Sequence, residues 1–219
     1  MTFTDLRPKV SPGDPAPEFA LPAIDGSGIA SLADYRGRSP LFLALFVGLW
    51  CPFCRRAIAQ LGATEQALVA SGVATLGVVA TTPENARLYF RFRPTRVRLA
   101  ADPALDTHRA FGVPRPEPTP ELFREVETVR VNPDAIFPEP LPIPQAADAL
   151  STLDGYRKNE TDRGEMERQW PQLKGQFLID RDGIVRWMNI ECAGVGLAGI
   201  GKFPSADEIL AAARALPNA

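Results

Sequence analysis

Two cysteines, Cys51 and Cys54, stand three residues apart in the run Cys51-Pro52-Phe53-Cys54. On a helix this spacing puts both thiols on nearly the same face, so one can attack a disulfide formed on the other. The same spacing supplies half of many zinc sites and also occurs in buried, unreactive pairs. Only Cys192 and His108 remain as further soft ligands. We therefore predict thiol–disulfide exchange, with no metal and no cofactor, and keep the half metal site and the inert pair as alternatives.

The elements around the pair suit a reactive thiol. Residues 41–48 (LFLALFVG) are apolar on both faces, which predicts a central strand covered on both sides. Pro52 fits the first turn of a helix predicted to run to about Ser71. Cys51 then lies at the helix start, where free N–H groups and the helix dipole favour a thiolate. We expect Cys51 to be the attacking nucleophile and Cys54 the deeper, resolving thiol, with Arg55 adding positive potential.

The remaining pattern predicts an α/β protein. Strands are expected at 41–48, 73–80 and 97–100, with helices at 52–71, from 82 onward and from 102 to 112. After a break, residues 176–190 predict a β-hairpin around Asp182-Gly183, and Ser205 with Glu208 predicts a capped final helix. Parallel strands with right-handed crossovers, followed by a hairpin, give a mixed sheet with helices on both faces.

Several segments resemble one known group of proteins. Residues 46–55 (FVGLWCPFCR) resemble the active-site segment of thioredoxin-like and peroxiredoxin-like proteins of the alkyl hydroperoxide reductase/thiol-specific antioxidant (AhpC/TSA) superfamily. Residues 13–21, 32–37, 102–112 and 177–183 resemble further segments of that superfamily, in its order. The resemblance covers about 13–113 and 175–216. It implies a thioredoxin fold, an oxidoreductase with antioxidant activity, a disulfide or hydroperoxide substrate and a thiol reductant.

The sequence also departs from both halves of that superfamily. Peroxiredoxins carry a Pro-x-x-x-Thr/Ser-x-x-Cys motif, and neither cysteine has the required Pro and Thr/Ser before it. Thioredoxin-type reductases carry a cis-proline before the penultimate strand, whereas residues 173–176 are Leu-Lys-Gly-Gln. In the resemblance, Lys174, next to Gly175, takes the place of an arginine of many peroxiredoxins. No acid occurs in residues 41–48 to match the buried carboxylate of thioredoxins. Disulfide exchange is thus the main expectation, a divergent thiol peroxidase the first alternative, and a non-enzymatic redox-sensing or interaction module the second.

The segment 114–172 has no counterpart in the resemblance. It is rich in proline and charge, and helices are predicted at 120–129, 146–156 and 163–170. We expect one thioredoxin-like domain spanning 1–219, with 114–172 as an insertion. The insertion is a candidate partner surface, homodimer contact or lid.

Other residues have competing interpretations. Cys192 is either a third thiol of the reaction or a small buried hydrophobe, and the second is favoured. His108 is expected at the surface or in a cap. Trp50 and Phe53 either shape the partner surface or pack. The glycine-rich run 194–201 is expected to be a closely packed loop near the cysteines rather than a phosphate-binding loop.

Composition narrows the classes of partner and location. The 24 basic and 26 acidic residues are spread along the chain, which argues against a nucleic-acid or anionic membrane surface. The longest apolar run, 41–49, is far shorter than the roughly 20 residues that span a bilayer. The N-terminal residues lack an apolar signal-peptide centre, and a close cysteine pair suits a reducing compartment. We therefore expect a cytoplasmic protein.

Overall fold

The computed structural model describes residues 9–217. Most of the N-terminal stretch used to predict the absence of a signal peptide, residues 1–8, lies outside them. A five-stranded mixed sheet forms the centre, in the order β5-β4-β3-β8-β9. Strands β3, β4 and β5 are parallel, while β8 is antiparallel to β3 and β9 is antiparallel to β8. The predicted mixed sheet is confirmed. Its strands are β3 (Leu41–Phe46), β4 (Ala74–Val79), β5 (Arg98–Ala101), β8 (Gly175–Ile179) and β9 (Val185–Ile190).

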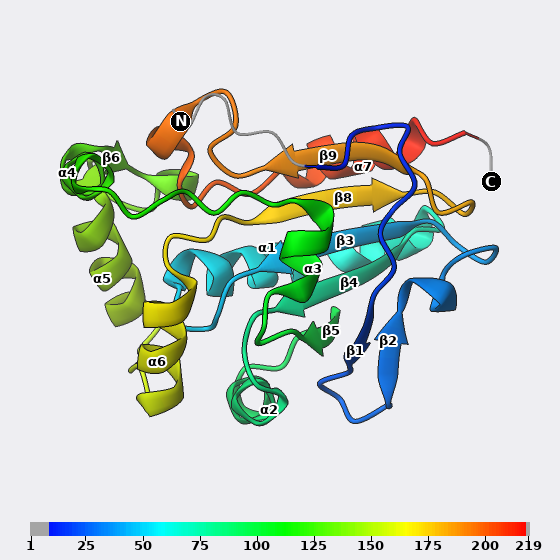
Figure 1. Cartoon of the computed structure of the whole chain (residues 1–219), viewed down its shortest axis with the longest axis horizontal. Coiled ribbons are helices and arrows are strands. Elements are labelled where there is room, and N and C mark those ends of the chain that lie inside the picture. The colour runs from blue at the N-terminus through cyan, green and yellow to red at the C-terminus, as the bar shows by residue number, and fades with distance from the viewer. Residues whose placement is uncertain (1–8, 218–219) are drawn as a thin grey trace.

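Helices cover the sheet on two sides. In Figure 1, α1 (Pro52–Ala70) and α7 (Ala206–Arg214) lie behind the sheet, and α3 (Asp106–Phe111) lies in front of it. Every residue of β3 is buried, because the strand has neighbours on both edges and helices over both faces. The run of apolar residues without alternation is thus explained by the central position of β3.

The helix α1 begins and ends where the sequence predicts. Cys51 is its N-cap, Pro52 follows in the first turn, and Gly72 closes it with a positive φ of 76°. Ile58, Leu61 and Leu68 are buried on the core side. The apolar pattern of the helix also predicts Val69 on the core side, but Val69 is exposed because it lies on the other side of the helix.

The prediction for α2 (Pro83–Phe92) is correct in position, but the apolar residues Leu88, Tyr89 and Phe92, which predict its core face, do not all face inward. Leu88 and Phe92 are exposed, whereas Asn85 and Ala86 are buried. The reason is a polar contact with the insertion: Asn85 donates to the carboxylate of Asp162, so a polar residue rather than an apolar stripe faces inward.

Short elements complete the frame. Strands β1 (Ala20–Pro22) and β2 (Ile29–Ser31) form an N-terminal hairpin, close to the short strands that the sequence suggests at 19–21 and 28–30. The β8–β9 hairpin turns at 180–184, where Asp180 accepts backbone hydrogen bonds from Asp182 and Ile184. Ser205 and Glu208 form the predicted capping box of α7.

The insertion is structured, as expected, and lies at one end of the sheet. It contains α4 (Pro120–Thr128), a two-stranded ribbon of β6 (Arg130–Val131) and β7 (Leu141–Pro142), α5 (Ile143–Leu153) and α6 (Glu160–Gln169). Figure 1 shows α4, α5 and α6 gathered beside the N-terminal end of α1. Helices α5 and α6 begin about three residues before their predicted starts, and the ribbon was not predicted. Leu122, Ile143 and Leu150 belong to the same hydrophobic core as the sheet.

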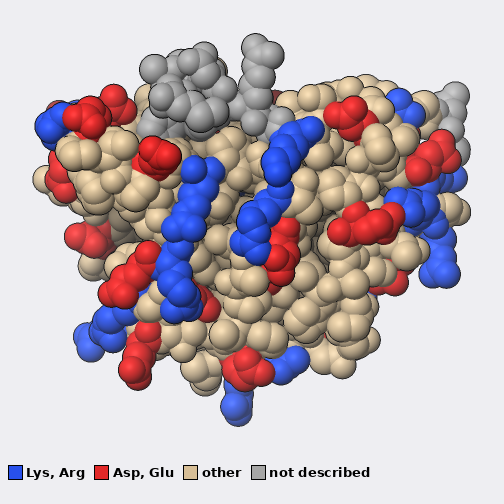
Figure 2. Space-filling view, in the orientation of Figure 1, with Lys and Arg blue, Asp and Glu red and all other residues tan. Residues whose placement is uncertain are grey.

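The surface carries mixed charge. Figure 2 shows acidic and basic side chains interspersed over one face of the molecule. None of the helices described between residues 9 and 217 is long and apolar enough to cross a membrane.

Candidate redox site

Cys51 and Cys54 lie where β3 passes into α1. Cys51 has an extended backbone and caps the helix, and its carbonyl accepts from the N–H groups of Cys54 and Arg55. Both thiols are free. Cys51 is 8% exposed and Cys54 is fully buried. Cys51 is therefore the more exposed of the two residues, and Cys54, three positions further along the chain, is the more deeply buried one.

The surroundings of Cys51 favour its thiolate. A hydrogen bond from the Cys54 thiol lowers the pKa of Cys51 more than burial raises it. The positive charge of Lys174 and the Cys54 backbone N–H lower the pKa further, while Glu191 opposes them. A lowered thiol pKa at a helix N-terminus is the environment of a nucleophilic cysteine.

Cys54 has the opposite character. Burial raises its pKa well above the ordinary value, and the hydrogen bond to Cys51 and the charge of a Cys51 thiolate raise it further. Cys51, whose pKa is lowered, therefore ionises before Cys54, whose pKa is raised.

A buried ion pair lies next to both thiols. The Lys174 Nζ is 2.9 Å from Oε1 of Glu191, and their side chains are 2% and 7% exposed. Glu191 also accepts from the backbone N–H groups of Lys174 and Gly201. Burial by itself lowers the pKa of Lys174, but Glu191 and the two cysteines outweigh it and raise that pKa above its ordinary value. The ammonium is oriented poorly for a hydrogen bond to Glu191, so among the described residues the contact is ionic in character.

Sequence reasoning missed Glu191 as a functional residue. Residues 41–48 contain no acid, but the fold brings a buried carboxylate from the end of β9. The antiparallel β8–β9 pairing places Glu191 beside Lys174, since the Glu191 N–H donates to the Lys174 carbonyl. The sequence signal that could have predicted this contact is a Lys and a Glu placed just outside the two ends of a predicted hairpin.

Trp50 is held in place by the insertion. Its indole N–H donates to Oε1 of Gln169 at 2.8 Å, and the same oxygen accepts from the Gly48 N–H at 2.9 Å. Gln169 in turn donates to the carbonyl of Ala80. A single buried amide at the end of α6 therefore fixes the loop between β3 and α1.

The glycine-rich loop reaches the site from the other side, as expected. Gly201 has a φ of +83°, and a Cβ added there would lie 2.5 Å from Cδ1 of Phe53. The close approach lets the Gly201 N–H donate to Glu191 and buries the Phe53 ring. Leu197 and Ile200 of this loop line the same cavity as Cys51.

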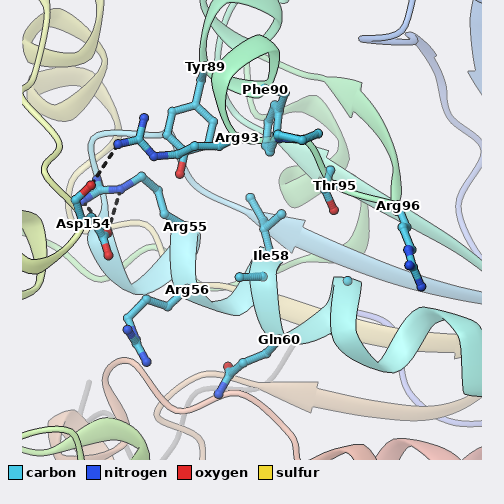
Figure 3. Close-up of a pocket in the computed structure, with 13 residues that line it drawn as sticks. Arg55, Arg56, Ile58, Gln60, Tyr89, Phe90, Arg93, Thr95, Arg96 and Asp154 are labelled. Atoms are coloured by element: carbon cyan, nitrogen blue, oxygen red, sulfur yellow. Dashed lines mark hydrogen bonds and ion pairs between the residues drawn. The ribbon is translucent and has the colours of Figure 1, made fainter.

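Arg55 is buried and its charge is matched away from the thiols. Its guanidinium donates to Oδ2 of Asp154, to the Leu49 carbonyl and to Ser151, and lies 4.1 Å from the Tyr156 ring centroid. Figure 3 shows Arg55 and Arg93 converging on Asp154 at one end of an open hollow of about 680 Å³. This hollow is larger than the one at Cys51 but contains neither cysteine. Arg55 is thus placed to bind the insertion to α1.

The other candidate residues have surroundings of their own. Cys192 is buried with a φ of +68°, burial raises its pKa, and it lines a separate hollow. His108 was predicted at the surface and is instead fully buried, because α3 turns that face toward the core; burial lowers its pKa to about 3. Gly175 begins β8, and a Cβ there would lie 2.8 Å from Val113. Within residues 9–217 no three His, Cys, Asp or Glu side chains form a metal-binding group.

A cis-proline is present, at a position other than the one considered. The Trp170–Pro171 peptide bond is cis, four residues before β8 begins. Pro171 and Cys51 line the same cavity. The sequence comparison places the expected proline at 173–176, where the strand begins.

Comparison with known proteins agrees with this geometry. The model of the AhpC/TSA family matches residues 12–188. Two proteins of Mycobacterium tuberculosis that carry the provisional name peroxiredoxin, MT2597 (strain CDC 1551 / Oshkosh) and Rv2521 (strain ATCC 25618 / H37Rv), are each 28% identical over 104 residues, or 48% of this chain. The matched region spans 65% of the length of these relatives.

Solved structures share the fold at low identity. The peroxidoxin BcpB from Mycobacterium tuberculosis is 15% identical with a TM-score of 0.58, over 95% of this chain and 99% of that one. The 2-Cys peroxiredoxin of Plasmodium vivax is 18% identical with a TM-score of 0.57, over 93% and 80%. A protein of Chlorobium tepidum provisionally named the thiol:disulfide interchange protein DsbE is 22% identical with a TM-score of 0.51, over 94% and 99%. The thioredoxin fold is thereby shown.

Proposed function

The chain belongs to the AhpC/TSA family, and from that membership we propose that it is a thiol–disulfide oxidoreductase acting through Cys51 and Cys54. The observation that carries the proposal is the asymmetry of the pair: Cys51, 8% exposed, has a lowered pKa at a helix N-terminus, and Cys54, fully buried, has a raised pKa. In this proposal the site also includes Trp50, Pro52, Phe53, Arg55, Lys174 and Gly175 as supporting residues.

The proposed reaction has two steps. The Cys51 thiolate attacks one sulfur of a disulfide, forms a mixed disulfide and releases the other half as a thiolate. Cys54 then loses its proton and attacks the Cys51 sulfur, which releases the second half and leaves a Cys51–Cys54 disulfide. Two electrons pass to the substrate, and a dithiol reductant restores the pair. Once Cys51 is bonded, its negative charge is gone, so the pKa of Cys54 falls and the second step is favoured.

Lys174 supports both steps electrostatically, although Glu191 partly offsets its charge. The positive charge of Lys174 lowers the pKa of Cys51 and of Cys54, so it stabilises whichever thiolate is present. Glu191 keeps that ammonium charged in a buried place. In this proposal, residues 1–219 form one thioredoxin-like domain with 114–172 as an insertion. The cysteine usage suggests that the protein works in the cytoplasm. A homodimer is compatible with the proposal.

Stopped-flow kinetics with a small disulfide test the proposal. Cys51→Ser is expected to abolish the reaction, and Cys54→Ser to stop at a mixed disulfide detectable by mass spectrometry. Cys192→Ser, which removes a buried thiol outside the pair, is the matched control and is expected to retain the parent rate. The proposal fails if the Cys51→Ser protein reacts as fast as the parent.

A second candidate is a thiol peroxidase, favoured by the peroxiredoxin relatives. The Cys51 thiolate would attack the outer oxygen of a hydroperoxide, giving a sulfenic acid and an alcohol, and Cys54 would condense with it to release water and form the disulfide. Consumption of hydroperoxide by the reduced protein tests this. A rate no faster than that of a free thiol removes the candidate.

A further inference from the structure

A cavity of about 300 Å³ opens at Cys51 and is mostly apolar. One wall comes from the chain around the N-terminus of α1, including Val47 and Trp50. The opposite wall comes from the insertion, with Val126 of α4 and Ala147 of α5. A cavity of this size lies at the lower end of the range for small-ligand sites.

The charges at this cavity do not favour an ionic ligand. Asp148 and Lys158 line it with opposite signs. Glu191 is already paired with Lys174. Most of the remaining lining is apolar or aromatic, so binding there gains mainly from burial of apolar area.

The insertion is fixed over the cysteine by buried polar contacts. Arg55 binds Asp154 and Ser151 at the end of α5, and Gln169 at the end of α6 binds Gly48 and Trp50. With the insertion in this place, Cys51 is 8% exposed. A folded protein presenting a disulfide would have to displace this wall, whereas a small molecule would not.

We propose, resting on the proposed function, that the substrate is a small organic molecule with an apolar body, bound between α1 and the insertion helices α4 and α5, and that the insertion excludes protein disulfides. The electrophilic group is an S–S bond, or an O–O bond if the peroxidase alternative holds. For a disulfide RSSR, the overall reaction converts RSSR and two cysteine thiols into two RSH and the Cys51–Cys54 disulfide. For a hydroperoxide it is ROOH plus two thiols giving ROH, water and the same disulfide.

Dibutyl disulfide and bis(2-hydroxyethyl) disulfide provide matched probes, because they have similar S–S bonds and differ in the polarity of their tails. The quantity compared is the rate constant for dibutyl disulfide divided by that for bis(2-hydroxyethyl) disulfide. We expect this ratio to be at least about 10-fold higher for the parent protein than for a free small thiol. Reduction of insulin is expected to be slower still. The pair tert-butyl hydroperoxide and hydrogen peroxide forms the O–O arm and distinguishes the two electrophiles.

Two variants locate the preference in the cavity. Ala147→Phe fills it and is expected to bring the ratio close to that of the free thiol, while Leu153→Phe, at an exposed position of the same helix outside the cavity, is expected to keep it. Val126→Ala enlarges the cavity and is expected to move the preference toward dihexyl disulfide, which provides a second test if Ala147→Phe does not fold.

The outcomes separate the two proposals. Equal ratios for parent and free thiol in both arms, or insulin reduced at least as fast as dibutyl disulfide, would overturn the inference while the proposed function stands. No dependence on Cys51 would overturn the proposed function. A preference for apolar hydroperoxides alone would support the inference with the O–O bond as the electrophile.

Discussion

The Nζ of Lys174 lies 2.9 Å from Oε1 of Glu191, in a buried ion pair beside two cysteines. The two residues lie at the ends of neighbouring hairpin strands: β8 begins just after Lys174, and β9 ends just before Glu191. A buried lysine is costly without a partner, and Glu191 supplies one. The ammonium can then act on the thiols without becoming neutral, so the ion pair links the stability of the hairpin to the chemistry of the site.

Lys174→Met is expected to raise the pKa of Cys51. The variant removes a positive charge that lowers that pKa. The thiolate then forms only at higher pH, so the midpoint of alkylation by iodoacetamide shifts upward and the rate at pH 7 falls. Lys174→Arg, which keeps the charge, is expected to remain close to the parent. An unchanged midpoint in a folded Lys174→Met protein would contradict the assigned role.

The same ion pair gives a stability prediction. Lys174→Met leaves the Glu191 carboxylate buried without its partner, which is expected to lower the free energy of unfolding by about 3–5 kcal/mol. The double variant Lys174→Met/Glu191→Gln removes both charges and is expected to recover much of that loss. Urea unfolding of the three proteins measures the effect. A double variant no more stable than the single one would mean that the pair is not coupled.

Gln169→Leu is expected to loosen the loop before the cysteines. The change removes the oxygen that accepts from Gly48 and Trp50, and a buried donor left without a partner costs about 1–3 kcal/mol. Gln169→Glu keeps the oxygen that accepts from Gly48 and Trp50 but loses the N–H that donates to the Ala80 carbonyl. Comparing the two variants therefore separates the loss of the acceptor from the loss of the donor. Unfolding experiments and tryptophan fluorescence report the result, and equal stability of Gln169→Leu and the parent would contradict it.

Asp154→Ala is expected to release the insertion from α1. Arg55, whose side chain is 1% exposed, would keep a buried charge without its carboxylate, at a cost of about 3 kcal/mol. With the wall loosened, a bulky maleimide is expected to alkylate Cys51 faster relative to iodoacetamide. Asp154→Asn keeps an acceptor and is expected to show a smaller effect. The prediction is wrong if the ratio of the two alkylation rates stays constant.

Local signals explain which features were predictable. The apolar run of β3, Pro52 after Cys51, and the Ser205–Glu208 box each specify their element through residues close in sequence. Contacts between distant residues carry no such signal: Glu191 reaches the cysteines only through strand pairing, and Gln169 reaches Gly48 across 121 positions. For the same reason the sequence gives the wrong core face for α2: Leu88 and Phe92 are apolar but exposed, because the helix packs against a polar part of the insertion.

Gly201→Ala and Gly194→Ala separate backbone strain from crowding at the active site. Both glycines have a positive φ, 83° and 76°, so both variants are expected to lose about 1–2 kcal/mol from the left-handed conformation. Only at position 201 does the new Cβ meet a neighbour, 2.5 Å from the Phe53 ring, whereas Gly194 has open space. Gly201→Ala is therefore expected to lose about 1–3 kcal/mol more. It should also move the N–H that binds Glu191, so its alkylation profile should shift while that of Gly194→Ala does not. Equal losses and unshifted profiles in the two variants would mean that the loop does not support the redox site.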